Sequence, residues 1–232
     1  MKVKAVNVGC GLNVCELSGW ENIDNSPNAR LSKHPLIRRL ARLSGLLPKQ
    51  LAEVPWPRCI RIHDATQSLP YPDSSLRYVY TSHFLEHHNP DVAERFLAHC
   101  YRVLAPGGIL RVVVPDFKLL VDEYLRGSQG DGEERVQAAD RFLLATQLLE
   151  GPTHDPKWIH ILRRLWGRDK HYWQYDEYSL RARLERAGFK NTARRAFGES
   201  MIPEVASLDI PVRAAESLYV EGEKGVIPNP ES

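Results

Sequence analysis

A short apolar run that breaks at two closely spaced glycines constrains the fold of this chain most strongly. Residues 6–8 read as the end of a strand, Gly9 and Gly11 follow, and residues 20–23 lead to Asp24. Strand, glycine turn and a second strand that ends in an acid form the frame of a nucleotide-binding α/β unit. Glycine has no Cβ, so this turn can be tight and a ligand can approach its backbone. Asp24 can accept two hydrogen bonds from a ribose diol.

The spacing of this unit argues against a dinucleotide ligand. The dinucleotide fingerprint has a third glycine and a helix whose N-terminus holds a pyrophosphate. No third glycine follows Gly11 at that spacing, and Asp24 comes sooner than the roughly 20 residues that a dinucleotide fold expects. Little helix fits between Gly11 and Trp20. The sequence therefore predicts a nucleoside-like ligand without phosphates.

Three more motifs follow in the order that such a domain needs. They are His63-Asp64-Ala65, the segment Ser82-His83-Phe84-Leu85-Glu86-His87, and the turn Leu104-Ala105-Pro106-Gly107-Gly108. With the glycine motif and Asp24, they resemble the class I S-adenosylmethionine-dependent methyltransferase family, in its small methyltransferase-domain type. The resemblance extends from residue 2 to about residue 224. It implies an α/β fold: a Rossmann-like, doubly wound, seven-stranded sheet, mostly parallel with an antiparallel last strand, plus helical insertions.

The same resemblance implies S-adenosyl-L-methionine as the cofactor. Asp24 matches the acid that binds the ribose, and Asp64 with Ala65 matches the motif at the adenine edge. Asp64 has a second interpretation as a turn or cap residue. The expected cofactor-binding residues are Asn7, Gly9, Cys10, Gly11, Asn13, Asp24, Asn25, Asp64, Ala65, Ser82 and His83.

Two histidines are candidates for acid–base catalysis. His83 comes first, because the resemblance places it near the methionine part of the cofactor or facing the acceptor, and its ordinary pKa near 6.5 suits proton removal. His171, at the start of the aromatic-rich stretch 171–178, comes second. His83 and His87 are four residues apart, but a metal site needs both on one helical face and a further ligand. We therefore expect no metal.

Two stretches exceed a minimal domain of this kind. Residues 30–57 place apolar residues at helical spacing among basic ones, which fits a solvated surface helix, a lid that presents cations to an anionic acceptor, or a helix on a membrane surface. Residues 117–170 predict helices over 117–125 and 136–149, followed by a basic segment with Arg163 and Arg164. This second insertion falls where the fold usually builds its acceptor pocket.

The remaining elements are predicted from periodicity and turn residues. Strands are expected over 3–8, 58–63, 78–82, 109–114, 189–197 and 217–223, and helices over 90–104 and 177–187. The family resemblance implies that the last strand inserts antiparallel between the fifth and sixth. The link 198–216 is long for a hairpin and is expected to fold over the pocket. Residues 225–232 are expected to be a disordered tail.

Composition limits the function classes. A length of 232 residues suits one α/β domain, assigned to residues 1–224, and the net charge of +2 argues against a nucleic-acid partner. No apolar run is long enough for a membrane span. The four cysteines have no metal-ligand spacing, which favours free thiols in a reducing cytoplasm.

The sequence therefore predicts a cytoplasmic methyltransferase that acts on a small-molecule acceptor. The two basic insertions favour an acceptor with a phosphate or carboxylate, with a saccharide or nucleotide sugar as one form. No N/D-P-P-Y segment follows the fourth strand, which argues against methylation of nucleic-acid bases. Two alternatives remain: a non-catalytic binding protein with the cofactor fold, and a nicotinamide-dependent oxidoreductase. Whether oxygen, nitrogen or carbon is methylated, and the oligomeric state, stay open.

Overall fold

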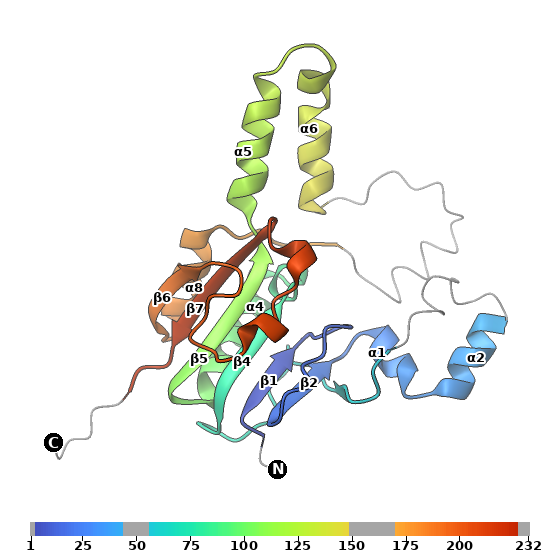
Figure 1. Ribbon diagram of the computed structural model, residues 1–232, viewed down its shortest axis with the longest axis vertical. Helices are drawn as coiled ribbons and strands as arrows, with labels where there is room; N and C mark the ends of the chain where they lie inside the picture. Colours follow the sequence, from blue (N-terminus) through green and yellow to red (C-terminus); the bar gives the residue numbers. More distant parts are fainter. Residues whose placement is uncertain (1–2, 44–55, 149–169, 227–232) are drawn as a thin grey trace.

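The computed structural model describes residues 3–43, 56–148 and 170–226. A seven-stranded sheet in the order β3-β2-β1-β4-β5-β7-β6 runs through its centre (Figure 1). The strands are β1 Ala5–Val8, β2 Trp20–Asp24, β3 Arg61–Ile62, β4 Leu76–Ser82, β5 Leu104–Pro115, β6 Lys190–Arg195 and β7 Ser217–Glu223. β1 is parallel to β2 and β4, β4 is parallel to β5, and β7 runs antiparallel to both of its neighbours. The expected fold class, including an antiparallel last strand between the fifth and sixth, is confirmed.

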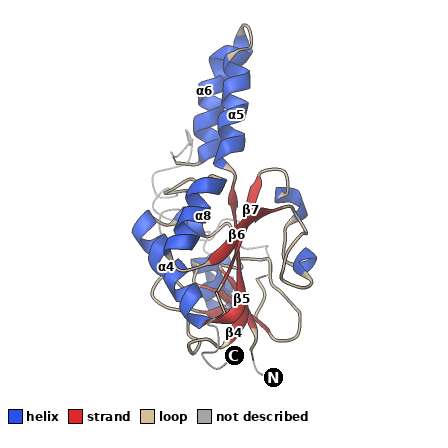
Figure 2. Ribbon diagram, turned by 90° about the vertical axis from the view of Figure 1, so that its left-hand side faces the viewer, coloured by secondary structure: helices blue, strands red, loops and turns tan. Residues whose placement is uncertain are grey.

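Helices cover both faces of the sheet. The α-helices are α1 Pro27–Ser32, α2 Pro35–Leu43, α4 Pro90–Val103, α5 Phe117–Ser128, α6 Glu133–Thr146 and α8 Glu177–Arg186, and the 3-10 helices are η1 Leu85–His87, η2 Val205–Ser207 and η3 Pro211–Arg213. Figure 2 shows α4 and α8 on one face. Asn89 caps α4 and Asp176 forms a capping box with Ser179 at α8, as short polar residues at helix starts do. The helices expected over 90–104 and 177–187 are therefore present.

The two insertions differ in how they relate to the sheet. Helices α5 and α6 pack against each other and project beyond the sheet as a hairpin (Figures 1 and 2). Residues 149–169, with Arg163 and Arg164, lie outside the described residues. In the first insertion, α2 exposes Leu36, Ile37 and Leu40. Residues 44–55 and the end of the predicted tail also lie outside the described residues. No helix in the described ranges is long and apolar enough to cross a membrane.

The first crossover is a loop rather than a helix, as the short spacing predicted. Residues 9–19, all of them described, contain turns but no helix. The buried Asn22 side chain accepts a hydrogen bond from the Cys15 amide (2.7 Å) and donates one to the Cys15 carbonyl (2.8 Å). The Asn7 side chain donates to the Asn13 carbonyl (2.7 Å) and to Asn22 Oδ1 (3.1 Å). Two buried amides thus satisfy the loop's backbone groups, which a helix would otherwise have paired.

Two strand boundaries differ from expectation. The third strand is reduced to two residues, Arg61–Ile62, at the edge of the sheet. The expected turn over 105–108 instead belongs to β5, which begins at Leu104 directly after α4. The reason is Lys224, just after β7: it exchanges backbone hydrogen bonds with Gly107 and Gly108, and its Nζ donates to the Leu104 carbonyl (2.7 Å). These tertiary contacts draw the glycine turn into the sheet.

Arg111 on β5 anchors the long link between β6 and β7. The link, with η2 and η3, lies on the face of the sheet opposite α4 and α8 (Figures 1 and 2). The Arg111 side chain is fully buried and donates to Asp209 Oδ2 (2.5 Å) and Glu221 Oε1 (3.0 Å). It also donates to the backbone carbonyls of Glu199 (2.9 Å) and Ala196 (3.3 Å). A single cation therefore holds both ends of the link against the sheet.

Replacing Arg111 with methionine is expected to lower the free energy of unfolding by about 3–5 kcal/mol, because two buried carboxylates lose the cation that they face. Urea denaturation followed by circular dichroism measures this loss. Arg77→Met is the matched control, since Arg77 is exposed on β4 and such surface changes stay within about 0.5 kcal/mol. Equal unfolding midpoints for the two variants would contradict the assigned role of Arg111.

Candidate functional site

The carboxyl ends of β1, β2 and β4 meet at one edge of the sheet. In the parallel register Val8 lies beside Ile23 and Thr81, so Gly9, Asp24 and His83 follow from neighbouring strand ends. Ligands of doubly wound sheets bind outside the carboxyl ends of the strands, where the strand order reverses. The edge therefore brings together most of the residues that the sequence assigned to the site.

The glycine turn has the geometry that its sequence predicted. Gly9 and Gly11 have φ angles of +65° and +53°, in the left-handed region that side chains disfavour. A Cβ on Gly9 would lie 2.5 Å from Cδ2 of Phe84, so this glycine also allows the β4 segment to pack closely. A Cβ on Gly11 would meet no atom of the described residues within 4 Å. The turn thus presents open space beside its second glycine.

Asp24 closes this turn from the end of β2. Its carboxylate is buried and accepts hydrogen bonds from the Gly11 amide (2.9 Å, Oδ2) and the Ser26 amide (2.6 Å, Oδ1). A carboxylate has about four lone-pair sites, so two of them remain for other donors. The neighbouring Asn25 is directed elsewhere, because its Oδ1 accepts from the guanidinium of Arg30 (2.9 Å to Nε).

Several other expected cofactor residues use their side chains inside the protein. Asp64 Oδ1 accepts from the Thr66 amide (3.0 Å) and hydroxyl (2.6 Å), as a turn residue does. The Cys10 thiol packs in a small cluster with Ala29 and Ile60, and burial, reinforced by the nearby Asp24 carboxylate, raises its pKa. Asn7 and Asn13 hold the loop. Asn7, Cys10 and Asn13 thus shape the turn with their side chains, and any contact of theirs with a cofactor stays a prediction.

His83 has the most constrained position at this edge. It directly follows Ser82, the last residue of β4, and its φ of +50° lies in the left-handed region, which is uncommon for a residue other than glycine. Its amide donates to the Val113 carbonyl (2.9 Å). Its ring lies between two elements: Nδ1 is 3.2 Å from Glu86 Oε1, and Nε2 is 3.1 Å from Ser217 Oγ.

His171 comes to the same place from a distant part of the sequence. The amides of Tyr172 and Trp173 donate to the Glu86 carbonyl (2.7 and 3.2 Å), which holds this segment against η1. Burial lowers the pKa of His171, and the nearby Glu86 carboxylate opposes that shift. The imidazole is therefore neutral near pH 7. Both candidate bases lie near Glu86, although their roles stay predictions.

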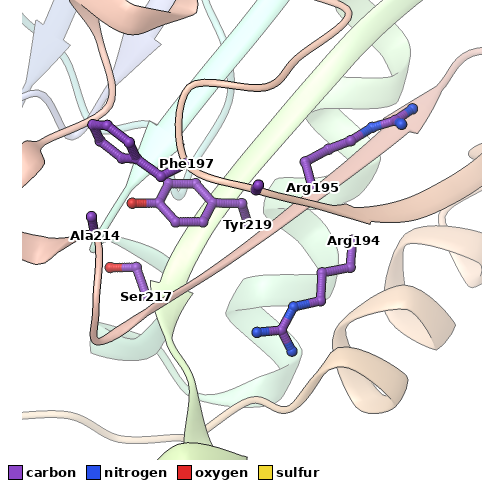
Figure 3. Close-up of a pocket in the computed structure, with 7 residues that line it drawn as sticks. Arg194, Arg195, Phe197, Ala214, Ser217 and Tyr219 are labelled. Atoms are coloured by element: carbon purple, nitrogen blue, oxygen red, sulfur yellow. The ribbon is translucent and has the colours of Figure 1, made fainter.

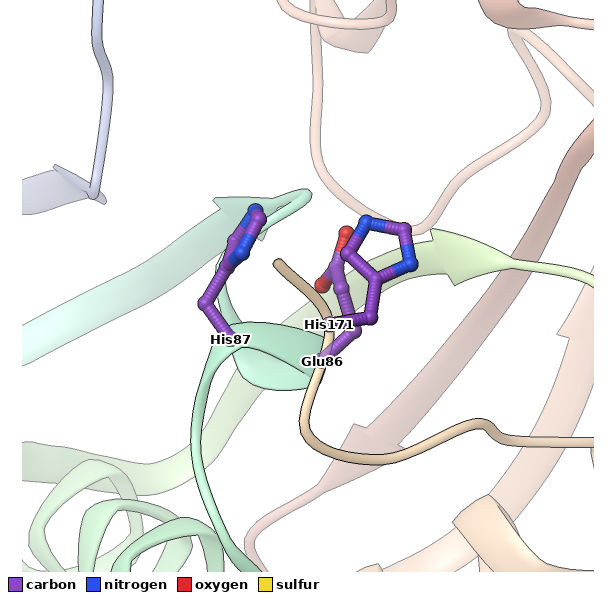
Figure 4. Close-up of side chains that lie close together, drawn as sticks. All are labelled: Glu86, His87 and His171. Carbon is purple, nitrogen blue, oxygen red and sulfur yellow. The ribbon is translucent and has the colours of Figure 1, made fainter. Parts of the chain in front are cut away.

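Glu86 is the residue that sequence reasoning missed. Its side chain is 0% exposed, and neither carboxylate oxygen has a hydrogen-bond partner among the described residues. Figure 4 shows Glu86 and His87 of η1 beside His171. The available sequence signal was an acid between histidines in the segment 83–88. The sequence interpretation paired His83 with His87 and found no further ligand. In the fold, His87 lies close to Glu86 and His171 instead.

A pocket of about 430 Å³ opens beside the start of β7 (Figure 3). It is lined by Arg194, Arg195, Ala196, Phe197, Ala214, Ser217 and Tyr219. Ser217 joins the pocket to His83, whose Nε2 it contacts. Arg194 pairs with Asp116 (2.9 Å) and Arg195 with Glu221 (3.2 Å). Sequence reasoning placed the acceptor cations in the two insertions and did not single out these arginines, because only the sheet brings β6 and β7 together.

Comparison with known proteins gives one family match. The family described as "Methyltransferase domain" matches residues 36–112, a range that begins after the glycine turn and ends within β5. No curated protein matches the sequence.

Solved structures with a similar chain path include several methyltransferases. One from Thermotoga maritima is 16% identical, with 95% of this chain and 81% of that one covered and a TM-score of 0.48. One from Methanosarcina mazei is 18% identical, with 97% and 94% covered and a TM-score of 0.47. The methyltransferase SibL is 15% identical at a TM-score of 0.45, with 96% of this chain covered, and the chain spans 50% of SibL's length.

The family match and the strand order agree with each other. The match covers the region from α2 to β5, and the resemblance implied the seven-stranded sheet in which β7 lies antiparallel between β5 and β6. Together they agree with what the motifs indicated: residues 36–112 match the methyltransferase-domain family, and the sheet has the class I, Rossmann-like fold of the S-adenosylmethionine-dependent methyltransferases that the chain resembles.

Proposed function

We propose that the protein transfers the methyl group of S-adenosylmethionine to a small acceptor that carries an anionic group. One observation carries this proposal: His83 joins the glycine turn to the arginine-containing pocket. The next residue, Phe84, packs on Gly9, and the His83 ring contacts Ser217 of the pocket. A donor bound at the turn and an acceptor bound in the pocket would therefore meet near this imidazole.

The residues at the turn fit the cofactor. Gly11 leaves space beside the backbone, and Asp24 keeps acceptor capacity at the end of β2 for a ribose diol. Asp64 follows the end of β3, where it would meet the adenine. When bound, S-adenosylmethionine supplies a methyl group on a positively charged sulfur. The chain's own task is to align the acceptor with that group and to exclude water, and such positioning can supply several kcal/mol of the barrier reduction.

The His83 ring is arranged to take a proton from an acceptor. The Glu86 carboxylate lies 3.2 Å from Nδ1 without hydrogen-bond geometry, and this nearby acceptor favours the tautomer with its hydrogen on that nitrogen. Nε2 then carries the lone pair and faces the Ser217 hydroxyl at the pocket. An acceptor hydroxyl bound beside Ser217 and within reach of Nε2 would release its proton to that nitrogen as its oxygen takes the methyl group. This assigns His83 as the general base and Glu86 as a residue that positions it.

The pocket favours an acceptor with a phosphate or carboxylate. Each guanidinium has five N–H donors, so Arg194 can pair with Asp116 and still donate to an anion. Its side chain is 42% exposed and therefore accessible. Tyr219 and Phe197 add aromatic surface that would suit a sugar or other ring.

Two alternatives give different binding results. A nicotinamide-dependent oxidoreductase would need a pyrophosphate site, but no helix follows the glycine turn in residues 9–19, all of which are described. A non-catalytic protein with this fold would bind neither donor nor acceptor productively. As part of the proposal, we place the enzyme in the cytoplasm, with a small molecule rather than a nucleic acid as its partner.

Calorimetric titration with S-adenosylhomocysteine tests the cofactor site. We expect micromolar affinity and no binding of NADH. Asp24→Asn should weaken S-adenosylhomocysteine about tenfold or more, because hydrogen bonds to a charged acceptor contribute about 1.5–3 kcal/mol. Asp91→Asn, an exposed acid in the first turn of α4, is the control. Equal affinity for the two variants, or binding of NADH alone, would refute the assignment.

Replacing His83 with asparagine is expected to lower kcat by about 100-fold or more, as loss of a general base does. Asparagine tolerates the left-handed backbone at this position, so the fold should survive. Release of S-adenosylhomocysteine is measured with the best substrate from a panel of phosphorylated and carboxylated small molecules. The affinity for S-adenosylhomocysteine, measured in parallel, separates loss of the base from loss of cofactor binding. His99→Ala, on α4, serves as the control, and an unchanged kcat for the His83 variant would exclude the base.

Arg194→Gln should raise KM for the anionic substrate about tenfold or more with little change in kcat, because an ion pair made in both ground and transition state acts on binding. Arg194→Lys keeps the charge beside Asp116 and should recover part of the affinity. Thermal midpoints of both variants separate binding from stability. If both have the parent KM, the pocket does not bind the anionic group.

A further inference from the structure

We propose that Glu86, His87 and His171 form a binding site for a divalent transition-metal ion, with zinc as the best fit. One ligand atom from each residue lies within 4.8 Å of the other two. Figure 4 shows the three side chains next to one another, two from η1 and one from the segment that precedes α8. Such a site is separate from the glycine turn and does not depend on the cofactor proposal.

The Glu86 carboxylate is the strongest observation. It is fully buried, and neither of its oxygens has a hydrogen-bond partner among the described residues. The side chain of His83 lies 3.2 Å away through Nδ1, outside hydrogen-bond geometry. A buried carboxylate without hydrogen-bond donors is rare in proteins, and a cation bound beside it would satisfy both oxygens. A metal ion bound between Glu86 and the two histidines would supply that charge.

The two histidines each present one nitrogen to this space. Nδ1 of His87 lies 3.0 Å from the Lys170 carbonyl, which can only accept, so Nδ1 carries the hydrogen and Nε2 carries the lone pair. Nδ1 of His171 lies 3.2 Å from the Thr146 carbonyl, which can only accept, so in the tautomer that donates to this carbonyl Nε2 carries the lone pair. Metal-ligating histidines commonly direct their second ring nitrogen to a backbone carbonyl in this way.

The donor set favours zinc. Two imidazoles and one carboxylate are the protein ligands of many zinc sites that keep a fourth position for water. Zinc–nitrogen bonds of about 2.0–2.1 Å require the ligand atoms to close by a small rotation of the side chains. The same set also suits other first-row metals, with geometry deciding between them. The second Glu86 oxygen remains beside His83, so metal binding and orientation of that ring are compatible.

The backbone holds these ligands in place before a metal arrives. The Glu86 carbonyl accepts from the Tyr172 and Trp173 amides, and the His171 amide donates to the Gln147 carbonyl (3.0 Å). These bonds fix η1, the end of α6 and the segment before α8 relative to one another. A metal here would link the end of β4 to the base of the α5–α6 hairpin. We infer that the bound metal holds η1 and the base of the hairpin in fixed positions on the acceptor side of the domain.

The test uses the full chain without a histidine tag, because a tag would bind metal. The protein is dialysed against a chelator and then titrated with ZnCl₂ by calorimetry and with CoCl₂ by visible absorption. We expect one equivalent of zinc with micromolar or tighter affinity, a cobalt d–d spectrum typical of nitrogen and oxygen ligands, and a higher thermal midpoint with zinc. Failure to bind zinc or cobalt would overturn the proposal.

Variants locate the metal. His87→Ala should weaken zinc about tenfold or more, because His87 is partly exposed and its removal deletes a ligand without opening the core. Glu86→Gln should do the same and removes the charge at nearly constant volume. His99→Ala, a partly buried histidine on α4, is the matched control.

Two readouts distinguish the proposed metal site from the cofactor site and from metal binding elsewhere on the protein. Affinity for S-adenosylhomocysteine should be unchanged in His87→Ala, so loss of zinc with retained cofactor binding shows that the fold is intact. If zinc affinity is the same in the parent, His87→Ala and Glu86→Gln, the metal lies elsewhere and the proposal fails. Failure of S-adenosylhomocysteine to bind any form would refute the cofactor assignment and leave the zinc result valid.

Discussion

The buried cation of Arg111 is the interaction on which the rest of this structure depends. It lies in β5, between β4 and β7, and pairs with Asp209 of the link and Glu221 of β7. By fixing Asp209 it also fixes the neighbouring Leu208, whose carbonyl accepts from Asn13 of the loop after the glycine turn (2.7 Å). The link, the last strand and the glycine turn are therefore coupled through one guanidinium. A buried pair of this kind stabilises only while it is complete, so the arrangement is sensitive to loss of a single charge.

The buried carboxylate of Glu86 is a second central group at the carboxyl edge of the sheet, where two segments pack around it. Its carboxylate lies beside His83, and its backbone carbonyl holds the segment of His171. The two charges differ in an important way: Arg111 is fully satisfied within the described residues, whereas Glu86 is not. An incompletely satisfied buried ion is expected at a functional site, since a ligand or a substrate completes it. This contrast is why we interpret the Arg111 network as structural and the Glu86 cluster as a site.

Much of the fold could be predicted from sequence because its cues are local. The glycine turn, the acid after β2, the capped helix α8 and the apolar run of β5 each follow from a few adjacent residues. The predictions were less accurate where long-range contacts decide the boundary. Lys224 extends β5 over the glycine turn at 107–108, and the third strand shortens to two residues at the sheet edge.

The sequence by itself determined the fold class and the glycine turn, because backbone conformation and strand patterning are set by neighbouring residues, and the family resemblance added His83 as a candidate base. Only the tertiary structure decided which distant side chains meet. It brought His171 to Glu86 and His87, and it built the pocket from β6 and β7 beside Ser217. These long-range contacts depend on the order and direction of the strands and on buried ion pairs. Those are properties of the assembled sheet, so no short stretch of sequence contains them.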